Sequence, residues 1–283
     1  MAKKPTRIIH KYLRHEKKFP HVWCPGCGNG IVMGALVRTI DRLGLSKDQI
    51  VLASGIGCSG RMPVYVDFNT LHTTHGRVLT FATGIKLSKP SLTVITVMGD
   101  GDATAIGGNH FIHAARRNIE LTAIIINNQI YGMTGGQHSP TTPYGSFATT
   151  ALYGNIEHPF SISELAVTAG GAYVARGTVY HVQLLEKLIE KAITHNGFSV
   201  VEVLSNCHTQ FGRKNDMVDP ITMMKFFRDH AVAIEKTHEM TQESMEDKFT
   251  IGVLADLQKP VYTEEYNKII QMTKNIRPEE ETE

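Results

Sequence analysis

Cysteine is scarce in this chain of 283 residues, which contains only four, and no apolar run approaches the length of a membrane span. The longest apolar runs, residues 92–98 and 123–126, fall far short of the roughly 18 to 20 residues that cross a bilayer. The basic N-terminal segment is not followed by the apolar stretch of a secretory signal. We therefore expect a cytoplasmic protein that does not associate with membranes and has no stable disulfides.

The chain also lacks an excess of charge of one sign. Its 29 basic and 27 acidic residues give a formal net charge of +2. Such a balance provides no field that would favour nucleic acid as the main partner. Hydrophobic residues make up 42% of the chain, which is enough to bury a large core. These features indicate an ordinary globular protein, for which small and anionic substrates remain compatible.

Short apolar runs alternate with helical periodicity along the chain. The runs at 50–53, 92–98, 121–126 and 198–204 each end in glycine, asparagine, aspartate or cysteine. Apolar residues at three- and four-residue spacing predict helices at 28–43, 103–117, 161–169 and 182–195. The alternation predicts an α/β fold with a parallel sheet covered on both faces. Ligands of such sheets bind beyond the carboxyl ends of the strands, where these polar residues fall.

Three regions follow from this pattern. Residues 1–20 are polar and without clear periodicity, and we interpret them as an N-terminal arm. Residues 21–215 form the α/β domain. After Pro220 the composition shifts to methionine, lysine, glutamate and histidine, with helical periodicity near residues 223–234. Residues 216–283 are therefore predicted to be a C-terminal helical extension that packs on a partner, and a solvated tail is an equal alternative past Arg277.

A diphosphate and metal site is predicted at two of the strand ends. Asp100 lies between two glycines after one run, and Asn128 follows the next run along the chain. Glycine lets the backbone approach a phosphate, and the helix N-terminus after Asp102 supplies N–H groups for negative charge. The carboxylate of Asp100, the amide oxygen of Asn128 and the carbonyl of Ile130 form an oxygen donor set suited to Mg²⁺. Two ordinary turns would also use these residue types.

The spacing of the two turns favours a cofactor site over that alternative. Asn128 follows 28 residues after Asp100, and this arrangement resembles the motif of thiamine diphosphate enzymes. The next residues, 131–137, are typical of a loop that folds over a cofactor. Gly132 and Met133 in that loop are placed to contact it.

The four cysteines are predicted to bind a metal centre. Cys24 and Cys27 form a Cys-x-x-Cys pair, whereas Cys58 and Cys207 follow separate strands. Four thiolates can hold one zinc ion or one [4Fe–4S] cluster, and the residue types do not separate the two. The alternative is that Cys58 and Cys207 are buried apolar residues, as free cysteines often are.

Taken together, the motifs resemble those of the β subunits of 2-oxoacid:ferredoxin oxidoreductases. The resemblance spans about residues 20 to 215. It rests on residues 23–28 (WCPGCG), 55–61 (GIGCSGR), 72–77 (HTTHGR), 99–102 (GDGD), 127–134 (NNQIYGMT) and 139–142 (SPTT). It implies the diphosphate-side domain of a thiamine diphosphate-binding fold.

The resemblance also implies which residues bind each cofactor. A [4Fe–4S] cluster is expected on Cys24, Cys27, Cys58 and Cys207, and Mg²⁺ on Asp100, Asn128 and the carbonyl of Ile130. The residues expected to contact thiamine diphosphate are Ile56, Gly57, Cys58, Ser59, His75, Gly101, Asp102, Gly132 and Met133.

Members of this family convert a 2-oxoacid, coenzyme A and oxidised ferredoxin into an acyl-CoA, CO₂ and reduced ferredoxin, or run the reverse carboxylation. The loop at 132–137 is most similar to that of the 2-oxoglutarate enzymes, which form succinyl-CoA. Arg61 falls where the family places a basic residue near the substrate carboxylate, although it also fits an ordinary surface arginine. No glutamate suited to activating thiamine diphosphate is evident. In the family it comes from an α subunit, so we expect an inactive isolated chain and an (αβ)₂ heterotetramer.

Other functions remain compatible with the sequence alone. The substrate is pyruvate, or a broad range of 2-oxoacids, in other members of the family; some broad-range relatives carry a lysine where this chain has Gly135. A non-oxidative thiamine diphosphate decarboxylase with structural zinc on the cysteines would contain the same motifs. A non-catalytic electron-transfer subunit would need the cysteines but not the diphosphate site.

Overall fold

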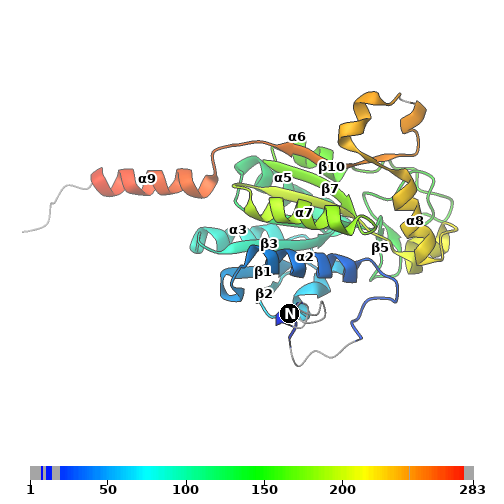
Figure 1. Cartoon of the computed structure of the whole chain (residues 1–283), viewed down its shortest axis with the longest axis horizontal. Helices are drawn as coiled ribbons and strands as arrows, with labels where there is room; N and C mark the ends of the chain where they lie inside the picture. The colour runs from blue at the N-terminus through cyan, green and yellow to red at the C-terminus, as the bar shows by residue number, and fades with distance from the viewer. Residues whose placement is uncertain (1–7, 9–10, 15–19, 242, 277–283) are drawn as a thin grey trace, which may run out of the picture.

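The computed structural model of the chain describes residues 8, 11–14, 20–241 and 243–276. Its main feature is an eight-stranded sheet in the order β2-β1-β3-β4-β8-β7-β10-β9 (Figure 1). The strands from β2 to β7 in this order run parallel, and β10 pairs antiparallel to β7. The strands of the sheet are β1 (Ile50–Ser54), β2 (Asn69–His72), β3 (Thr93–Gly99), β4 (Thr122–Asn127), β7 (Tyr173–Thr178), β8 (Ser199–Leu204), β9 (Ala231–Ala233) and β10 (Phe249–Asp256).

Helices cover both faces of the sheet, as predicted. Successive strand residues point to opposite faces, so Ile50 and Leu52 pack in one apolar cluster while Val51 and Ala53 pack in the other. The first cluster lies under α2 (Asn29–Leu43) and α7 (Val182–Thr194). The second lies under α3 (Val78–Ser88), α5 (Gly108–Arg117) and α6 (Ile162–Thr168).

The four strands predicted from apolar runs are neighbours in the centre of the sheet. They are β1, β3, β4 and β8, which pair in that order with parallel register. Because neighbouring parallel strands end at the same edge, the polar residues after these strands are brought together. The sequence therefore located the edge that carries the candidate site.

One predicted helix is interrupted. The pattern at 103–117 forms two helices, α4 (Asp100–Thr104) and α5, separated by residues 105–107. Gly107 packs against the backbone of the previous turn, since a Cβ at this position would lie 2.3 Å from the Asp102 carbonyl oxygen. The carbonyl of Ile106 accepts a hydrogen bond from Arg77, 3.0 Å away. The break lets α4 begin at the strand end while α5 packs against the sheet.

Most of the predicted N-terminal arm lies outside the described residues. Within residues 11–14, Tyr12 is buried and donates a hydrogen bond to Asp41, and Leu13 forms a bridge with Val66. This short segment packs on the chain's own core.

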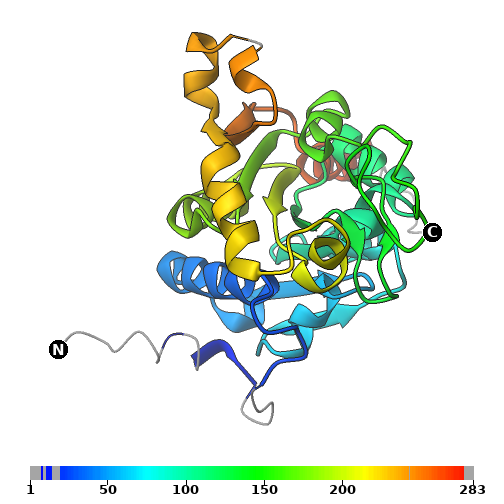
Figure 2. The same cartoon turned by 90° about the vertical axis from the view of Figure 1, so that its right-hand side faces the viewer.

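After residue 216 the chain is less helical than the sequence pattern indicated. It forms α8 (Pro220–His230) and α9 (Tyr262–Ile276), but β9 and β10 lie between them and extend the sheet. The 3₁₀ helices η4 (Ile234–Glu239) and η5 (Glu243–Met245), between β9 and β10, stand out from the body in both views (Figures 1 and 2). Helix α9 projects away from the sheet (Figure 1). Residues 277–283 of the predicted extension lie outside the described residues. No helix in the described part of the chain is long and apolar enough to span a membrane.

Candidate functional site

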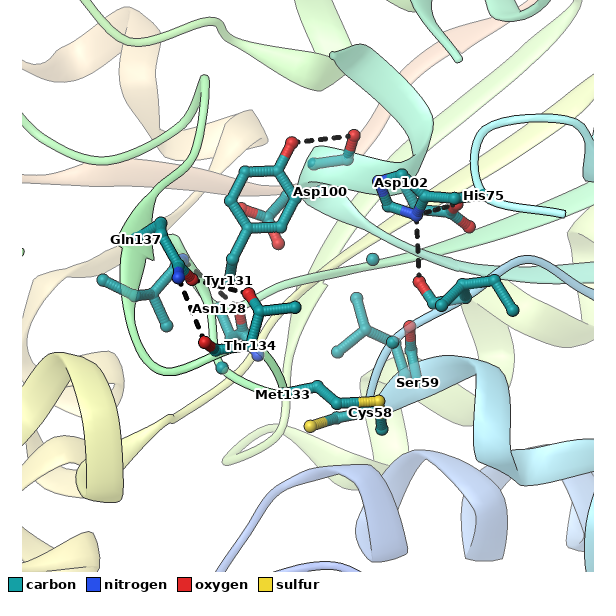
Figure 3. Close-up of a pocket in the computed structure, with 17 residues that line it drawn as sticks. Cys58, Ser59, His75, Asp100, Asp102, Asn128, Tyr131, Met133, Thr134 and Gln137 are labelled. Atoms are coloured by element: carbon teal, nitrogen blue, oxygen red, sulfur yellow. Dashed lines mark hydrogen bonds and ion pairs between the residues drawn. The ribbon is translucent and has the colours of Figure 1, made fainter. Parts of the chain in front are cut away.

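A cavity of about 390 Å³ lies at the carboxyl ends of β1, β3 and β4 (Figure 3). Its walls are the segments that follow these strands, together with the loop after β5 (Ile130–Tyr131). Every residue predicted from the sequence to contact thiamine diphosphate or Mg²⁺ lines it. These residues are Ile56, Gly57, Cys58, Ser59, His75, Asp100, Gly101, Asp102, Asn128, Ile130, Gly132 and Met133.

Asp100 begins α4 at the floor of this cavity and is only 2% exposed. Its Oδ2 accepts hydrogen bonds from the hydroxyls of Ser139 at 2.5 Å and Thr141 at 2.7 Å. Burial raises the pKa of Asp100, and the two hydroxyls only partly oppose this effect. Both partners are neutral, so a cation bound at the carboxylate would stabilise its ionised form.

A tight turn after β4 places Asn128 and Ile130 beside Asp100. Gln129 has φ +61°, a left-handed conformation that is unusual for a residue other than glycine. The turn is held by hydrogen bonds from the Gln129 amide to Asn127 Oδ1 (3.2 Å) and from the Thr142 hydroxyl to the Gln129 carbonyl (2.6 Å). The Ile130 amide donates to Asn128 Oδ1 at 3.3 Å. This geometry keeps Asn128 and Ile130 at the cavity wall.

The oxygen donors of this turn and of Asp100 fit a Mg²⁺ ion shared with a diphosphate. Hard cations of this kind prefer carboxylate, amide and carbonyl oxygens and retain water. In the described part of the chain, no group of three or more His, Cys, Asp or Glu side chains could hold a metal ion. A set of Asp100, Asn128 and the Ile130 carbonyl has only one such side chain, so the diphosphate and water would complete it.

His75 and Asp102 form the opposite wall. His75 Nδ1 lies 2.8 Å from Asp102 Oδ1 and 3.2 Å from the Ile56 carbonyl oxygen. The Gly76 amide donates to the same Asp102 oxygen at 2.6 Å. Burial raises the pKa of Asp102, while Gly76 and His75 oppose the rise. Asp102 thus ties the segment after β2 to the start of α4, above the cavity floor.

The four cysteines come together from three distant segments. A Cβ at Gly132 would lie 3.4 Å from the sulfur of Cys207 and 3.8 Å from that of Cys58, so both thiols flank this residue. The Cys24–Cys27 turn is closed by a 3.0 Å backbone hydrogen bond and is tied to the end of β8, because Asn206 donates to the Gly26 carbonyl at 2.8 Å.

The thiols influence one another electrostatically. Burial and, to a smaller extent, the other three cysteines raise the pKa of Cys27 to about 12, against a backbone hydrogen bond at Asn29 that lowers it. Burial also raises the pKa of Cys58 to about 11, with contributions from Cys207 and Cys24. A cationic metal centre binds thiolates, so its binding here would remove the protons of these thiols.

Comparison with known proteins agrees with this geometry. A family described as the C-terminal TPP-binding domain of thiamine pyrophosphate enzymes matches residues 54–203. The 2-oxoglutarate synthase subunit KorB of Methanothermobacter marburgensis is 53% identical over 250 residues, which cover 88% of this chain and 87% of that protein. The KorB subunit of Methanocaldococcus jannaschii is 48% identical over 265 residues, covering 94% and 98%. The chain belongs to the KorB family.

The fold similarity extends over nearly the whole chain. The solved structure of 2-oxoglutarate:ferredoxin oxidoreductase from Magnetococcus marinus, with 2-oxoglutarate, coenzyme A and succinyl-CoA bound, aligns with a TM-score of 0.81 and 31% sequence identity. The alignment covers 98% of this chain and 97% of that one. Membership of the KorB family makes the chain a subunit of an oxidoreductase. It leaves the non-oxidative decarboxylase and the non-catalytic electron-transfer subunit without support.

Arg61 is the one predicted substrate-binding residue, and it does not line the cavity. It lies in the 3₁₀ helix η2 (Ser59–Val64), and its side chain is exposed. Its charge is close enough to lower the pKa of Cys58, against the larger effect of burial. Arg61 therefore lies near the thiol of Cys58 at the edge of the cavity.

The sequence analysis gave no role to several residues that build the site. Tyr131, Thr134 and Gln137 line the cavity, and Ser139 and Thr141 hold Asp100. These side chains lie in the two short strands β5 and β6 (Gln137–His138) and in the loops beside them, where no periodic pattern marks which residue points inward. The motifs at 127–134 and 139–142 and the segment 131–137 marked this region, but not the role of each residue in it.

Gly101 is expected to be required for cofactor binding, because the ring of Tyr131 lies where a side chain would be. A Cβ at Gly101 would lie 2.3 Å from this ring, whose hydroxyl donates to the Gly101 carbonyl at 3.3 Å. The added methyl group would overpack the site at a free-energy cost of about 1 to 3 kcal/mol. Gly101→Ala should therefore bind thiamine diphosphate with Mg²⁺ about tenfold more weakly in a calorimetric titration. Gly108→Ala is the matched control, since nothing lies within 4 Å of its Cβ position. Equal affinities for the two variants would contradict the prediction.

Proposed function

We propose that this chain is the cofactor-binding subunit of an enzyme that converts 2-oxoglutarate, coenzyme A and two oxidised ferredoxins into succinyl-CoA, CO₂ and two reduced ferredoxins, or catalyses the reverse carboxylation. The observation that carries the proposal is the position of Cys58. This residue lines the cavity and also belongs to the group of four cysteines. A cofactor in the cavity and a metal centre on the thiols would therefore be direct neighbours.

The polar floor and the glycine-lined walls of the cavity suit thiamine diphosphate. Asp100, Asn128 and the Ile130 carbonyl would hold Mg²⁺, and the N-terminus of α4 would face the diphosphate. Gly101 and Gly132 leave room for close approach, and Met133 and Ile56 supply apolar contact. When bound, thiamine diphosphate would supply the nucleophile for the 2-oxo carbon and would accept the electron pair left by CO₂.

A [4Fe–4S] cluster on Cys24, Cys27, Cys58 and Cys207 is favoured over zinc. A zinc ion needs four sulfurs at about 2.3 Å from one point. Zinc has no redox chemistry, so a zinc ion at this position could not accept electrons. A cubane cluster holds its four ligands farther apart, and it also supplies the one-electron acceptor that oxidative decarboxylation requires.

A partner subunit is needed to complete the site. The described residues that line the cavity include two aspartates but no glutamate to activate the aminopyrimidine ring. The relatives are themselves named as subunits, which supports assembly with an α subunit. We propose an (αβ)₂ heterotetramer in the cytoplasm that passes electrons to ferredoxin.

The proposed function is tested by assaying the purified chain and its complex with the α subunit side by side. With 2-oxoglutarate, coenzyme A and ferredoxin, the complex should reduce ferredoxin, and the isolated chain should be at least about 100-fold slower because it lacks a catalytic acid–base group. Pyruvate is the comparison substrate. Turnover by the isolated chain, or a higher kcat/KM for pyruvate, would contradict the proposal.

We propose that Arg61 binds a carboxylate of 2-oxoglutarate, since a guanidinium pairs with a carboxylate through two parallel hydrogen bonds. Replacing it by methionine should raise the KM for 2-oxoglutarate about 10- to 100-fold, as expected for loss of hydrogen bonds between charged groups. The KM for coenzyme A and the visible spectrum should not change. A changed spectrum with an unchanged KM would instead assign Arg61 to the metal centre, near Cys58.

A further inference from the structure

A buried ion pair connects two strands beneath the cofactor site. Arg176 of β7 and Glu202 of β8 are paired in register, and Arg176 Nε donates to Glu202 Oε2 at 2.8 Å. Arg176 is 9% exposed and Glu202 is 2% exposed. Buried ion pairs are often no more stabilising than apolar residues of the same volume. A contribution to folding alone therefore does not account for a charged pair within the sheet.

The other carboxylate oxygen of Glu202 faces the turn after β4. Glu202 Oε1 accepts a hydrogen bond from Asn127 Nδ2 at 2.8 Å, while Ser163 donates to Oε2 through both its amide and its hydroxyl. An ionised carboxylate is only an acceptor. The amide group of Asn127 must therefore present its NH₂ to Glu202 and its oxygen to the opposite side.

That oxygen is part of the cofactor site. Asn127 Oδ1 accepts from the Gln129 amide at 3.2 Å and lies 3.0 Å from the Thr141 hydroxyl. The same hydroxyl lies 2.7 Å from Asp100 Oδ2. The orientation of one amide thus supports the left-handed turn at Gln129, and its oxygen shares the single proton of the Thr141 hydroxyl with Asp100.

The ionised carboxylate of Glu202 keeps the side-chain amide of Asn127 in this one orientation. Burial acts to raise the pKa of Glu202, but Arg176 and the hydrogen bonds from Ser163 and Asn127 hold it below its ordinary value. Arg176 is itself fixed on its far side, where Nη2 donates to the Ser161 hydroxyl at 3.0 Å. Neutral glutamic acid, which could donate a proton, is thereby disfavoured.

We infer that Glu202 is a positioning residue for the magnesium and diphosphate site, acting through Asn127 on the turn that carries Asn128 and Ile130. The inference rests on the proposed function, because that function places the cofactor at this turn. Groups that orient metal ligands in this way typically contribute about 10- to 100-fold to metal affinity.

The test is a reversal of the donor and the acceptor between the two side chains. Glu202→Gln presents an NH₂ to Asn127, and Asn127→Asp presents a second carboxylate to Glu202. Either single variant should weaken binding of thiamine diphosphate with Mg²⁺ about 10- to 100-fold. In the double variant, the amide introduced on β8 donates to the carboxylate introduced at the end of β4. That carboxylate keeps a negative charge in the network and still accepts from the Gln129 amide, so the double variant should regain at least about tenfold in affinity.

Binding is measured by calorimetric titration of the cofactor-free αβ complex, and thermal melting reports on folding. Glu186→Gln is the matched control. Glu186 accepts from Arg38 at 2.6 Å and from Arg42 at 2.7 Å between α2 and α7, so the variant loses ion pairs remote from the cavity. It should melt at a lower temperature but bind the cofactor as the wild type does.

The outcomes separate this inference from the proposed function. If the wild type binds the cofactor and Glu202→Gln binds it equally well, or if the double variant binds no better than the single variants, the positioning role is overturned and the proposed function stands. If the wild-type complex itself does not bind thiamine diphosphate with Mg²⁺, the proposed function fails. Loss in both single variants with recovery in the double variant supports the inference, since a purely structural ion pair would not regain cofactor affinity in this way.

Discussion

Replacing Asp100 by asparagine is expected to abolish stabilisation of the protein by thiamine diphosphate and Mg²⁺. Asparagine keeps the shape of the side chain but removes the charge, and Asp100 would provide the only carboxylate of the proposed metal site. Changes in groups that merely orient metal ligands cost about 10- to 100-fold in affinity, so loss of a direct anionic ligand should cost at least about 100-fold. Activity at a fixed cofactor concentration should fall accordingly.

Thermal melting gives the sharpest measurement of this effect. A ligand present at about 100 times its Kd stabilises the folded state by about 2.7 kcal/mol, and a 100-fold weaker variant should gain only about 0.4 kcal/mol under the same conditions. Asp48→Asn, at an exposed position in the 3₁₀ helix η1 (Lys47–Gln49), is the control and should show the full shift. A full shift in Asp100→Asn would show that the metal binds elsewhere.

Replacing Cys207 by alanine is expected to remove the proposed iron–sulfur cluster and with it the proposed reduction of ferredoxin. One ligand of four is lost, and a bound metal centre typically contributes about 10 kcal/mol or more to the state that holds it, so iron content should fall at least about tenfold. The chain has no fifth cysteine to replace the missing ligand. Binding of thiamine diphosphate should persist, because its proposed anchors lie at the ends of β3 and β4.

The measurement is iron and sulfide content together with the visible spectrum of the purified complex. Met217→Leu is the control, since this sulfur-containing residue packs in the same apolar cluster as Cys207 but is no thiolate ligand. Wild-type iron content in Cys207→Ala would exclude this cysteine as a ligand. Zinc in place of iron in the unmodified complex would restore the structural-zinc alternative for the four cysteines.

The centre of the sheet was predictable because its four strands are almost wholly apolar. Parallel strands buried on both faces produce continuous apolar runs, and β1, β3, β4 and β8 have this composition. Each also ends in residues with recognisable chemistry. The edge of the sheet, and the cavity-lining residues that directly follow these strands, could therefore be located from sequence alone.

The remainder of the sheet was missed for an equally physical reason. β7 contains Arg176 and Gly177, which interrupt its apolar run, and β10 contains Gly252 and ends in a charged residue. The charge of Arg176 makes sense only beside Glu202 on the neighbouring strand. Pairing across strands is a property of the fold, and a single sequence without related sequences beside it does not reveal it.

The positions of the four thiols along the chain determine when, during synthesis and folding of the protein, all four can meet. Cys24 and Cys27 leave the ribosome early, whereas Cys207 follows the eighth strand and reaches its position only when β8 has inserted between β4 and β7. A metal–sulfur centre on these ligands would therefore be installed only after translation of most of the chain, once β8 has taken its place in the sheet. The brown colour of such a centre would report that the polypeptide has matured, and truncated or misfolded chains would remain colourless.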